Sequence, residues 1–106
     1  MSTRLEKLTQ MQQADPADPF CSYGIALEHA KLGHTDEAMT WLDKTLALDA
    51  HYSYAYYQKA RLLVQQGKPD DAKAVLDAGM ADAAQGSSSD AKHALAEMRS
   101  LRETVR

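Results

Sequence analysis

The fold of this chain can be read from the stretch GHTDEAMTWLD, residues 33–43, because it returns 34 residues later as GKPDDAKAVLD, residues 67–77. The two stretches carry the same residues at five positions, namely Gly, Asp, Ala, Leu and a final Asp. A fixed period of this length is the sequence signature of stacked helical hairpins. Chains built in this way usually bind other proteins, so the repeat bears on function as well as on fold.

The repeat extends beyond these two stretches. Aligning residues 19–52 with residues 53–86 gives nine identities, whereas an alanine-rich composition gives roughly three by chance. Two of the additional identities pair Tyr23 with Tyr57 and Ala47 with Ala81. The chain therefore contains two copies of one structural unit.

Residues that start and stop helices fall at the boundaries of the repeat. Asp18 is suited to cap a helix over about 19–32, and Gly33 is suited to end it in the left-handed conformation. The same signals predict three more helices: Thr35 to Leu48 or Ala50, Ser53 to Gly67, and Pro69 to about Gln85, with Thr35 and Ser53 as N-caps.

One further helix is predicted at each end of the chain. Thr3 and Glu6 form a capping-box pattern ahead of an apolar stripe made by Leu5, Leu8 and Met11. Apolar residues also recur at three- and four-residue steps towards the C-terminus. By the period of the repeat, the first helix takes the place of a second hairpin helix and the last takes the place of a first one.

The predicted fold class is therefore all-α, a right-handed stack of antiparallel helical hairpins. Its six helices are arranged as a half-repeat, two full repeats and a half-repeat that caps the stack. The predicted parts of this single domain over 1–106 are an N-terminal helix over 2–15, repeat 1 over 19–52, repeat 2 over 53–86 and a C-terminal capping helix over 88–106.

The order of small, acidic and apolar residues in each copy resembles the tetratricopeptide repeat. The resemblance covers residues 19–86 directly and, through the half-repeats, nearly the whole chain, whose layout looks like that of small stand-alone bacterial members. The alanines let neighbouring helices approach closely, and the leucines fill the seam between them. The residues that carry the resemblance are Ala26, Gly33, Asp36, Glu37, Ala38 and Leu42, and then Ala60, Gly67, Asp70, Asp71, Ala72 and Leu76.

The sequence departs from the family pattern at several positions. Ser22 and Lys59 stand where the family often has an aromatic residue and a leucine. Ala50 and Ala84 stand where it commonly has proline, so the second helix of each copy is free to continue by a turn. Gly79, inside the fourth predicted helix, is expected to cost about 1 kcal/mol relative to Ala.

In the family that the chain resembles, the first helices of successive repeats line a concave groove that receives a segment of a partner protein. The resemblance implies that aromatic and arginine side chains, which are enriched at binding hot spots, line this groove. An alternative is that Phe20, Tyr52 and Tyr54 fill junctions between helices, and Tyr56 falls on the packing side. The implied partner-binding residues are Phe20, Tyr23, Leu27, Tyr54, Tyr57, Gln58, Arg61 and Lys92. Arg99 would extend the groove further along the last helix.

Some members of the family hold the C-terminal carboxylate of chaperones with Lys and Asn side chains. The matching positions of the first copy carry Tyr23 and Leu27, so that clamp is incomplete here. Arg61 and Lys92 remain to receive one carboxylate. The resemblance thus implies a peptide groove with a weak preference for acidic segments.

Composition limits the expected partners and location. The net charge of −3 and the pI of about 5.7 argue against a nucleic-acid partner, which needs a basic surface. The N-terminal stretch is polar, and no segment approaches the roughly 18 apolar residues of a membrane span. The single Cys21 cannot form an internal disulfide. We expect a cytoplasmic protein that binds neither nucleic acid nor membrane.

No catalytic pattern or metal-ligand spacing stands out. His29 and His34 lie five residues apart, on different helix faces or across a turn, and His51 and His93 stand alone. Cys21 has no histidine or cation nearby in the sequence to activate it. The chain is predicted to be non-enzymatic, with no catalytic residue, no metal and no cofactor.

The leading hypothesis is a non-catalytic protein–protein interaction module that acts as an adaptor, assembly factor or co-chaperone-like protein. An alternative is a homo-oligomeric scaffold that associates through the apolar faces of the terminal helices. A third is a small enzyme or metal carrier that uses histidine and cysteine side chains.

Overall fold

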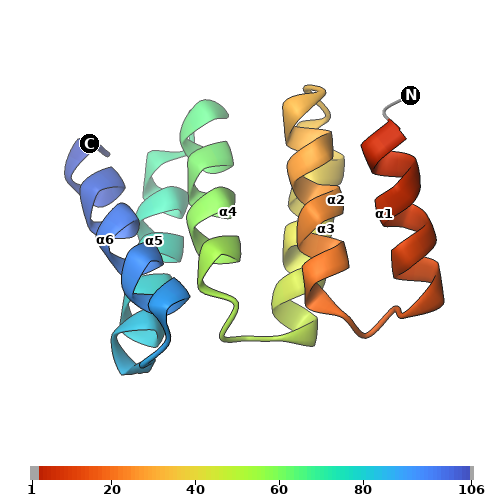
Figure 1. Ribbon diagram of the computed structural model, residues 1–106. Helices are drawn as coiled ribbons and strands as arrows, with labels where there is room; N and C mark the ends of the chain where they lie inside the picture. The colour runs from red at the N-terminus through yellow and green to blue at the C-terminus, as the bar shows by residue number, and fades with distance from the viewer. Residues whose placement is uncertain (1–2, 106) are drawn as a thin grey trace. The chain divides into compact units, whose positions relative to one another are not determined.

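The computed structural model describes residues 3–105, and six α-helices make up most of this part of the chain (Figure 1). No strand occurs between residues 3 and 105, so the predicted all-α class is confirmed. Within the same residues, no helix has the length and apolar character that a bilayer crossing requires. In chain order the helices are α1 (Thr3–Ala14), α2 (Pro19–Lys31), α3 (Thr35–Leu48), α4 (Ser53–Gln65), α5 (Pro69–Gln85) and α6 (Ser89–Thr104).

The helices form two compact units, which divide between Ala50 and His51. In the first unit, α2 and α3 pack as a hairpin, and α1 packs against α2. In the second unit, α5 packs against both α4 and α6, and α4 also contacts α6. Each unit thus contains one helical hairpin and one additional helix, which is the composition of one whole repeat and one half-repeat.

Small residues allow close packing inside each hairpin. An alanine on each of the two helices is buried, which leaves room for the backbones to approach. The leucine four residues after the second alanine is also buried and fills the space beside them. The buried residues are Ala26, Ala38 and Leu42 in the first hairpin, and Ala60, Ala72 and Leu76 in the second.

In the first unit, α1 covers α2 with part of its predicted apolar stripe. Leu8 is buried, and its methyl groups lie against the backbone at Gly24. The Arg4 Nε atom lies 3.0 Å from the Oε1 atom of Glu28, which pairs that buried carboxylate with a cation. Met11, the last residue of the stripe, is 48% exposed.

In the second unit, α6 completes the core. Ala94 and Met98 of α6 are fully buried together with Ala60, Leu76 and Ala83. The other large apolar side chains of α6 also pack against this cluster. The apolar face of α6 is therefore used inside its own unit. These packing side chains are Leu95, Leu101 and the following Val105.

The aspartate predicted to start a helix and the glycines predicted to end helices have the expected conformations and contacts. Gly33 and Gly67 have φ angles of 81° and 74°, which is the left-handed region that glycine favours. The Asp18 carboxylate accepts a hydrogen bond of 2.9 Å from the Phe20 N–H at the start of α2. The predicted ends of the first hairpin helix are therefore confirmed.

The prediction that Thr35 and Ser53 are N-cap residues is wrong. Thr35 and Ser53 are the first helical residues of α3 and α4, and the N-cap positions belong to His34 and Tyr52. Neither of these residues caps its helix with its side chain. In α3 the reason is the short turn: only one residue separates Gly33 from the helix, so Thr35 is already helical.

Candidate peptide-binding surface

Four of the predicted binding residues lie on one side of α4. They recur at three- and four-residue spacing, which places them on a common helix face. Arg61 is exposed at the C-terminal end of this face, and the other three are half-buried. The face thus combines aromatic surface with one accessible cation. The four residues are Tyr54, Tyr57, Gln58 and Arg61.

A hollow lies beside this face, between α4 and α6. Its volume is about 410 Å³, and Tyr57 lines it from α4. Helix α6 contributes a carboxylate, hydroxyl groups and apolar side chains. The hollow can therefore receive an apolar side chain and also hydrogen-bond to a backbone. Its lining from α6 consists of Ala96, Glu97, Ser100, Leu101 and Thr104.

Arg61 is held along the edge of the aromatic face. Its guanidinium carbon lies 5.8 Å from the centre of the Tyr57 ring, within the range of a cation–π interaction. Its Nη1 atom also donates a hydrogen bond of 3.2 Å to the side-chain oxygen of Gln58. These contacts reduce the side-chain freedom that binding a ligand would otherwise remove.

Tyr54 and Tyr57 both pack against the core cluster of the second unit. Partial burial raises the pKa of the Tyr54 phenol above its ordinary value, and the negative charges of Glu97 and Asp90 raise it further. Tyr54 therefore stays a neutral hydrogen-bonding group over the physiological range. Its position beside α6 gives it a packing role within the unit.

The remaining predicted residues lie on α2 and α6. Phe20 is 55% exposed, so its ring is accessible to a partner. Tyr23 and Leu27 are half-buried on the same side of α2. Lys92 is exposed in the first turns of α6. Tyr57, Gln58 and Arg61 thus lie near α6 in the second unit. Phe20, Tyr23 and Leu27 belong to the first unit.

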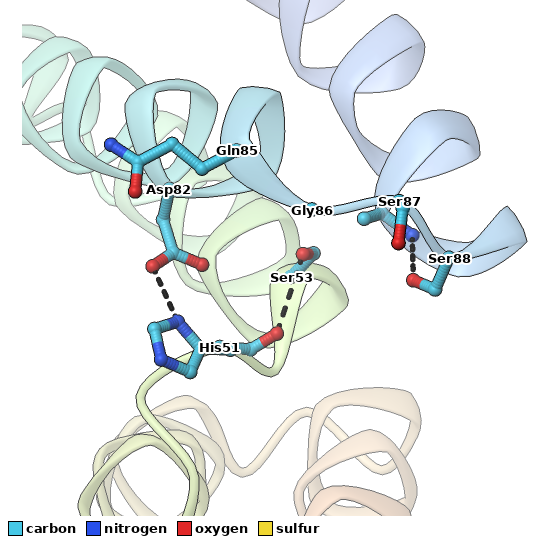
Figure 2. A pocket seen from close by; sticks show the side chains of 8 residues that line it. His51, Ser53, Asp82, Gln85, Gly86, Ser87 and Ser88 are labelled. Atoms are coloured by element: carbon cyan, nitrogen blue, oxygen red, sulfur yellow. Dashed lines mark hydrogen bonds and ion pairs between the residues drawn. The ribbon is translucent and has the colours of Figure 1, made fainter.

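A polar hollow in the second unit was not anticipated from the sequence. It measures about 390 Å³, and His51 and Asp82 form one side of it. The His51 Nδ1 atom lies 2.7 Å from the Asp82 Oδ1 atom. Figure 2 shows the imidazole and the carboxylate facing each other. The Ser53 hydroxyl donates to the His51 backbone carbonyl at 3.4 Å. A separation of 31 residues between the paired side chains leaves no short-range sequence signal that could have found this pair.

Cys21 is buried on α2, as expected for a thiol without a reactive role. Burial raises its pKa above the ordinary value, and the adjacent Asp18 carboxylate raises it further. The Cys21 thiol lies 3.8 Å from the Asp18 Oδ2 atom and donates to it. Both effects keep the thiol protonated, which makes it a poor nucleophile and a poor metal ligand.

His29 and His34 meet across the turn between α2 and α3. Their Nδ1 atoms are 3.2 Å apart, and their ring centres are 5.4 Å apart. Glu37, in the first turn of α3, lies close to both imidazoles. Of the residues from 3 to 105, these three form the one group of histidine, cysteine or carboxylate side chains with metal-ligand proximity.

Comparison with known proteins supports the resemblance seen in the repeat. The family model of the tetratricopeptide repeat matches residues 29–98. No curated protein sequence matches the chain. Several solved structures have a similar fold.

Three solved structures illustrate this similarity. PcrH, solved with the chaperone binding region of PopD, has a TM-score of 0.85 at 18% identity, covering 95% of this chain and 74% of that chain. A tetratricopeptide repeat domain protein from Salinibacter ruber has a TM-score of 0.77 at 25% identity, covering 87% and 90%. The first such domain of Spaghetti (RPAP3), bound to the HSP90 peptide SRMEEVD, has a TM-score of 0.69 at 18% identity, covering 94% and 78%.

Proposed function

Because the chain belongs to the tetratricopeptide repeat family, we propose that it is a non-catalytic module that binds a peptide segment of another protein. The observation that carries this proposal is the face of α4 beside α6, where Tyr57 borders a hollow and Arg61 lies exposed next to it. Aromatic and arginine side chains supply much of the energy at protein interfaces. The structures of PcrH with a region of PopD and of Spaghetti with an HSP90 peptide support a peptide as the ligand.

The segment places an apolar side chain in the hollow beside Tyr57 and an acidic group near Arg61. The preference for acidic segments is weak, because Glu97 lines the same hollow and repels a second negative charge there. Phe20, Tyr23 and Leu27 on α2 supply a second contact surface for the same partner. Lys92 adds a further cation on α6. A cytoplasmic adaptor or assembly role, within a single domain over 1–106, completes the proposal.

The proposal is tested by measuring peptide affinity of wild type and single variants. The acidic peptide SRMEEVD and a copy with its acidic residues replaced by their amides serve as fluorescent probes, beside a panel of apolar-acidic segments. We expect Tyr57→Ala to weaken binding by about 2 kcal/mol, or roughly thirtyfold, because it removes one wall of the hollow. Arg61→Ala is expected to weaken only the acidic probes.

Lys68→Ala is the matched control for Arg61→Ala. It removes one exposed cation from the turn between α4 and α5, so net charge changes equally while the α4 face stays intact. If Tyr57→Ala and Arg61→Ala both bound every peptide as the wild type does, the α4 face would not be the binding surface. Circular dichroism confirms that each variant stays helical.

The natural partner is sought with a quantitative pull-down from host cytosol. The wild type is compared with the triple variant Tyr23→Ala, Tyr57→Ala, Arg61→Ala. A protein that only the wild type retains identifies the partner, and peptides from its sequence then enter the affinity assay. Equal retention by both proteins would count against the proposed surface and favour self-association.

A further inference from the structure

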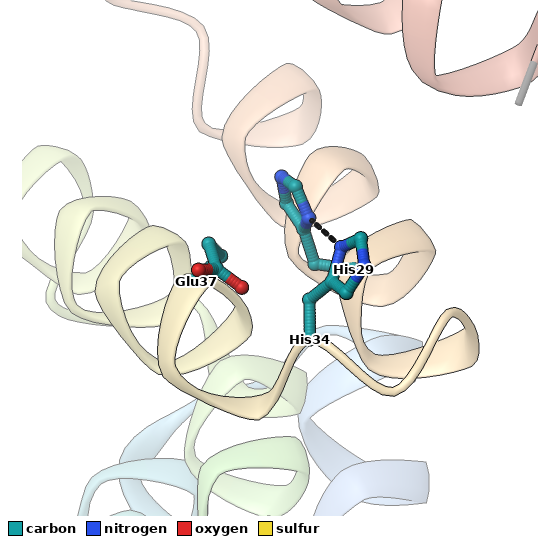
Figure 3. Close-up of side chains that lie close together, drawn as sticks. All are labelled: His29, His34 and Glu37. Atoms are coloured by element: carbon teal, nitrogen blue, oxygen red, sulfur yellow. Dashed lines mark hydrogen bonds between the residues drawn. The ribbon is translucent and has the colours of Figure 1, made fainter. Parts of the chain in front are cut away.

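Three potential metal ligands meet at the turn between α2 and α3. His29 lies in the last turn of α2, His34 occupies the N-cap of α3, and Glu37 lies in the first turn of α3. One ligand atom of each lies within 4.8 Å of the other two (Figure 3). His34 and Glu37 are exposed and His29 is half-buried, so an ion can reach the group from solvent.

The backbone of the turn brings the two histidines together. The Gly33 N–H donates to the Ala30 carbonyl at 3.1 Å, and the His34 N–H donates to the His29 carbonyl at 2.8 Å. With the positive φ of Gly33, these bonds form a Schellman motif, which places the residue after the glycine beside the residue five positions earlier. The two imidazoles are therefore held near each other by the fold before any ion binds.

The separation of the imidazole nitrogens fits a tetrahedral ion. A zinc–nitrogen bond of about 2.0–2.1 Å and a tetrahedral angle put two ligand nitrogens roughly 3.3 Å apart. The observed distance between the Nδ1 atoms of His29 and His34 is 3.2 Å. The Glu37 carboxylate, within 4.8 Å of the imidazole ligand atoms, needs to move closer to complete such a site. An exposed glutamate can do so by changing rotamer.

The charge and proton balance also suit a divalent cation. A hydrogen bond between the two Nδ1 atoms without metal requires that one of them carries the proton and the other accepts. An ion between the two nitrogens replaces that shared hydrogen, and the proton moves through solvent to the Nε2 atom of the same ring. Two neutral imidazoles and the Glu37 carboxylate then face the ion with one negative charge. Water can take the fourth position.

We propose that His29, His34 and Glu37 form a binding site for a divalent transition-metal ion of the zinc class. Imidazole nitrogens select ions such as Zn²⁺, Co²⁺ and Ni²⁺, whereas Mg²⁺ and Ca²⁺ require more oxygen ligands than this group offers. The bound ion joins the end of α2 to the start of α3, and it stabilises the first hairpin by an amount that rises with the logarithm of its concentration once that exceeds the dissociation constant.

The second copy of the repeat has the same turn without the ligands. The Gly67 N–H donates to the Val64 carbonyl at 3.0 Å, and the Lys68 N–H donates to the Leu63 carbonyl at 2.9 Å. Leu63 and Lys68 stand where the first copy has His29 and His34. The backbone motif therefore does not require histidine. Leucine and lysine, the residues of the second copy, can replace His29 and His34 without changing the turn.

The test is zinc titration of the whole chain by isothermal calorimetry, with cobalt(II) absorption as a report of tetrahedral coordination. We expect one ion per chain, a rise in the thermal unfolding midpoint with added zinc, and no such rise with magnesium or calcium. The variant His29→Leu, His34→Lys, which copies the second turn, is expected to lose zinc binding while keeping its helical circular dichroism.

Two single variants sharpen the assignment. Glu37→Gln is expected to weaken zinc binding at least tenfold, since loss of even an outer-shell partner weakens metal affinity by roughly 10–100-fold. His93→Ala removes an exposed histidine of α6 and is expected to bind zinc as the wild type does. Absence of zinc binding by the wild type, or undiminished binding by His29→Leu, His34→Lys, would overturn the proposal.

Discussion

Gly79 lies where α5 comes closest to its neighbours in the second unit. A Cβ atom added at this position would lie 2.6 Å from the Tyr56 Cβ atom and 2.8 Å from the Met98 Sδ atom. The Tyr56 Cβ atom sits next to the backbone and cannot move away without shifting α4. The expected helix-propensity cost of Gly79 is therefore opposed by a packing benefit, because the missing side chain permits the close approach of the neighbouring helices.

We expect Gly79→Ala to lower the free energy of unfolding by about 1–3 kcal/mol, because the steric cost of overpacking exceeds the gain in helix propensity. Urea denaturation followed by circular dichroism measures the change.

Gly24→Ala is the matched control for this prediction. Its Cβ atom would meet only the Leu8 side chain, at 2.9 Å and beyond, and the ends of a leucine can move. We expect Gly24→Ala to change stability by less than about 1 kcal/mol. Equal stability of the Gly79→Ala variant and the wild type would contradict the packing argument.

At the scale of single helices, only some starts are stabilised by a side chain. Ser88 has extended backbone angles at the N-cap of α6, and its hydroxyl accepts a hydrogen bond of 3.0 Å from the Ala91 N–H. Asp18 serves α2 in the same way. The N-cap residues His34, Tyr52 and Lys68 make no such bond. Their helices depend more on packing of the hairpin.

Ser88→Ala is expected to lower the free energy of unfolding by about 1 kcal/mol, because it leaves an N–H at the start of α6 without its acceptor. The same denaturation assay measures this loss. Ser87→Ala makes the identical change one residue earlier, in the exposed loop, and is expected to stay within about 0.5 kcal/mol of the wild type. A larger loss for Ser87→Ala than for Ser88→Ala would show that the loop, and not the cap, matters.

Helix positions followed from the sequence more reliably than helix caps did. Glycine and proline act on their own backbone, so Gly33, Gly67 and Pro69 mark boundaries whatever surrounds them. A cap, in contrast, depends on which residue is the last outside the helix. At Thr35 and Ser53 the helix begins one residue earlier than predicted. The residues predicted as N-caps are therefore the first residues of their helices.

At the scale of the whole molecule, the structure bears on the alternative of a homo-oligomeric scaffold. That alternative needs apolar faces on both terminal helices. The large apolar side chains of α6 pack against the core of the second unit, and the hollow beside Tyr57 exposes Ala96 and Leu101 among polar groups and not as a continuous apolar face. On α1, Leu8 is buried and Met11 is exposed. Met11 and the half-buried Leu5, which lines a hollow of about 320 Å³ with Ile25 and Trp41, form a smaller apolar area than a stable dimer interface requires.

We therefore expect a monomer in solution at concentrations in the tens of micromolar. Light scattering on a sizing column should return a mass close to 11.7 kDa. A mass of twice that value would favour the scaffold alternative, and Met11→Ser would then show whether α1 forms the contact. The measurement needs no knowledge of the partner.

The proposed binding surface was only partly accessible from the sequence. Position within the repeat and resemblance to the family suggested Tyr57, Gln58 and Arg61; in the structure Arg61 contacts both of the others, and Tyr57 borders the hollow beside α6. The opposite wall, with Glu97 and Ser100, was missed. The repeat pattern does not predict which side chains of α6 face α4. Their orientation depends on how two helices that are far apart in the chain pack together.

The 34-residue period and the residues that start and stop helices were sufficient to predict the six helices, the two repeats and the family. These follow from signals that act within a few residues, such as helix punctuation and the spacing of apolar side chains. Packing between helices settled the rest: why Gly79 must be small, how His51 meets Asp82, and how α6 closes a hollow beside Tyr57. The physical reason is that a backbone preference belongs to each residue and its near neighbours in the chain. A contact between two helices forms only when the helices pack, and it depends on side chains that are distant in the sequence.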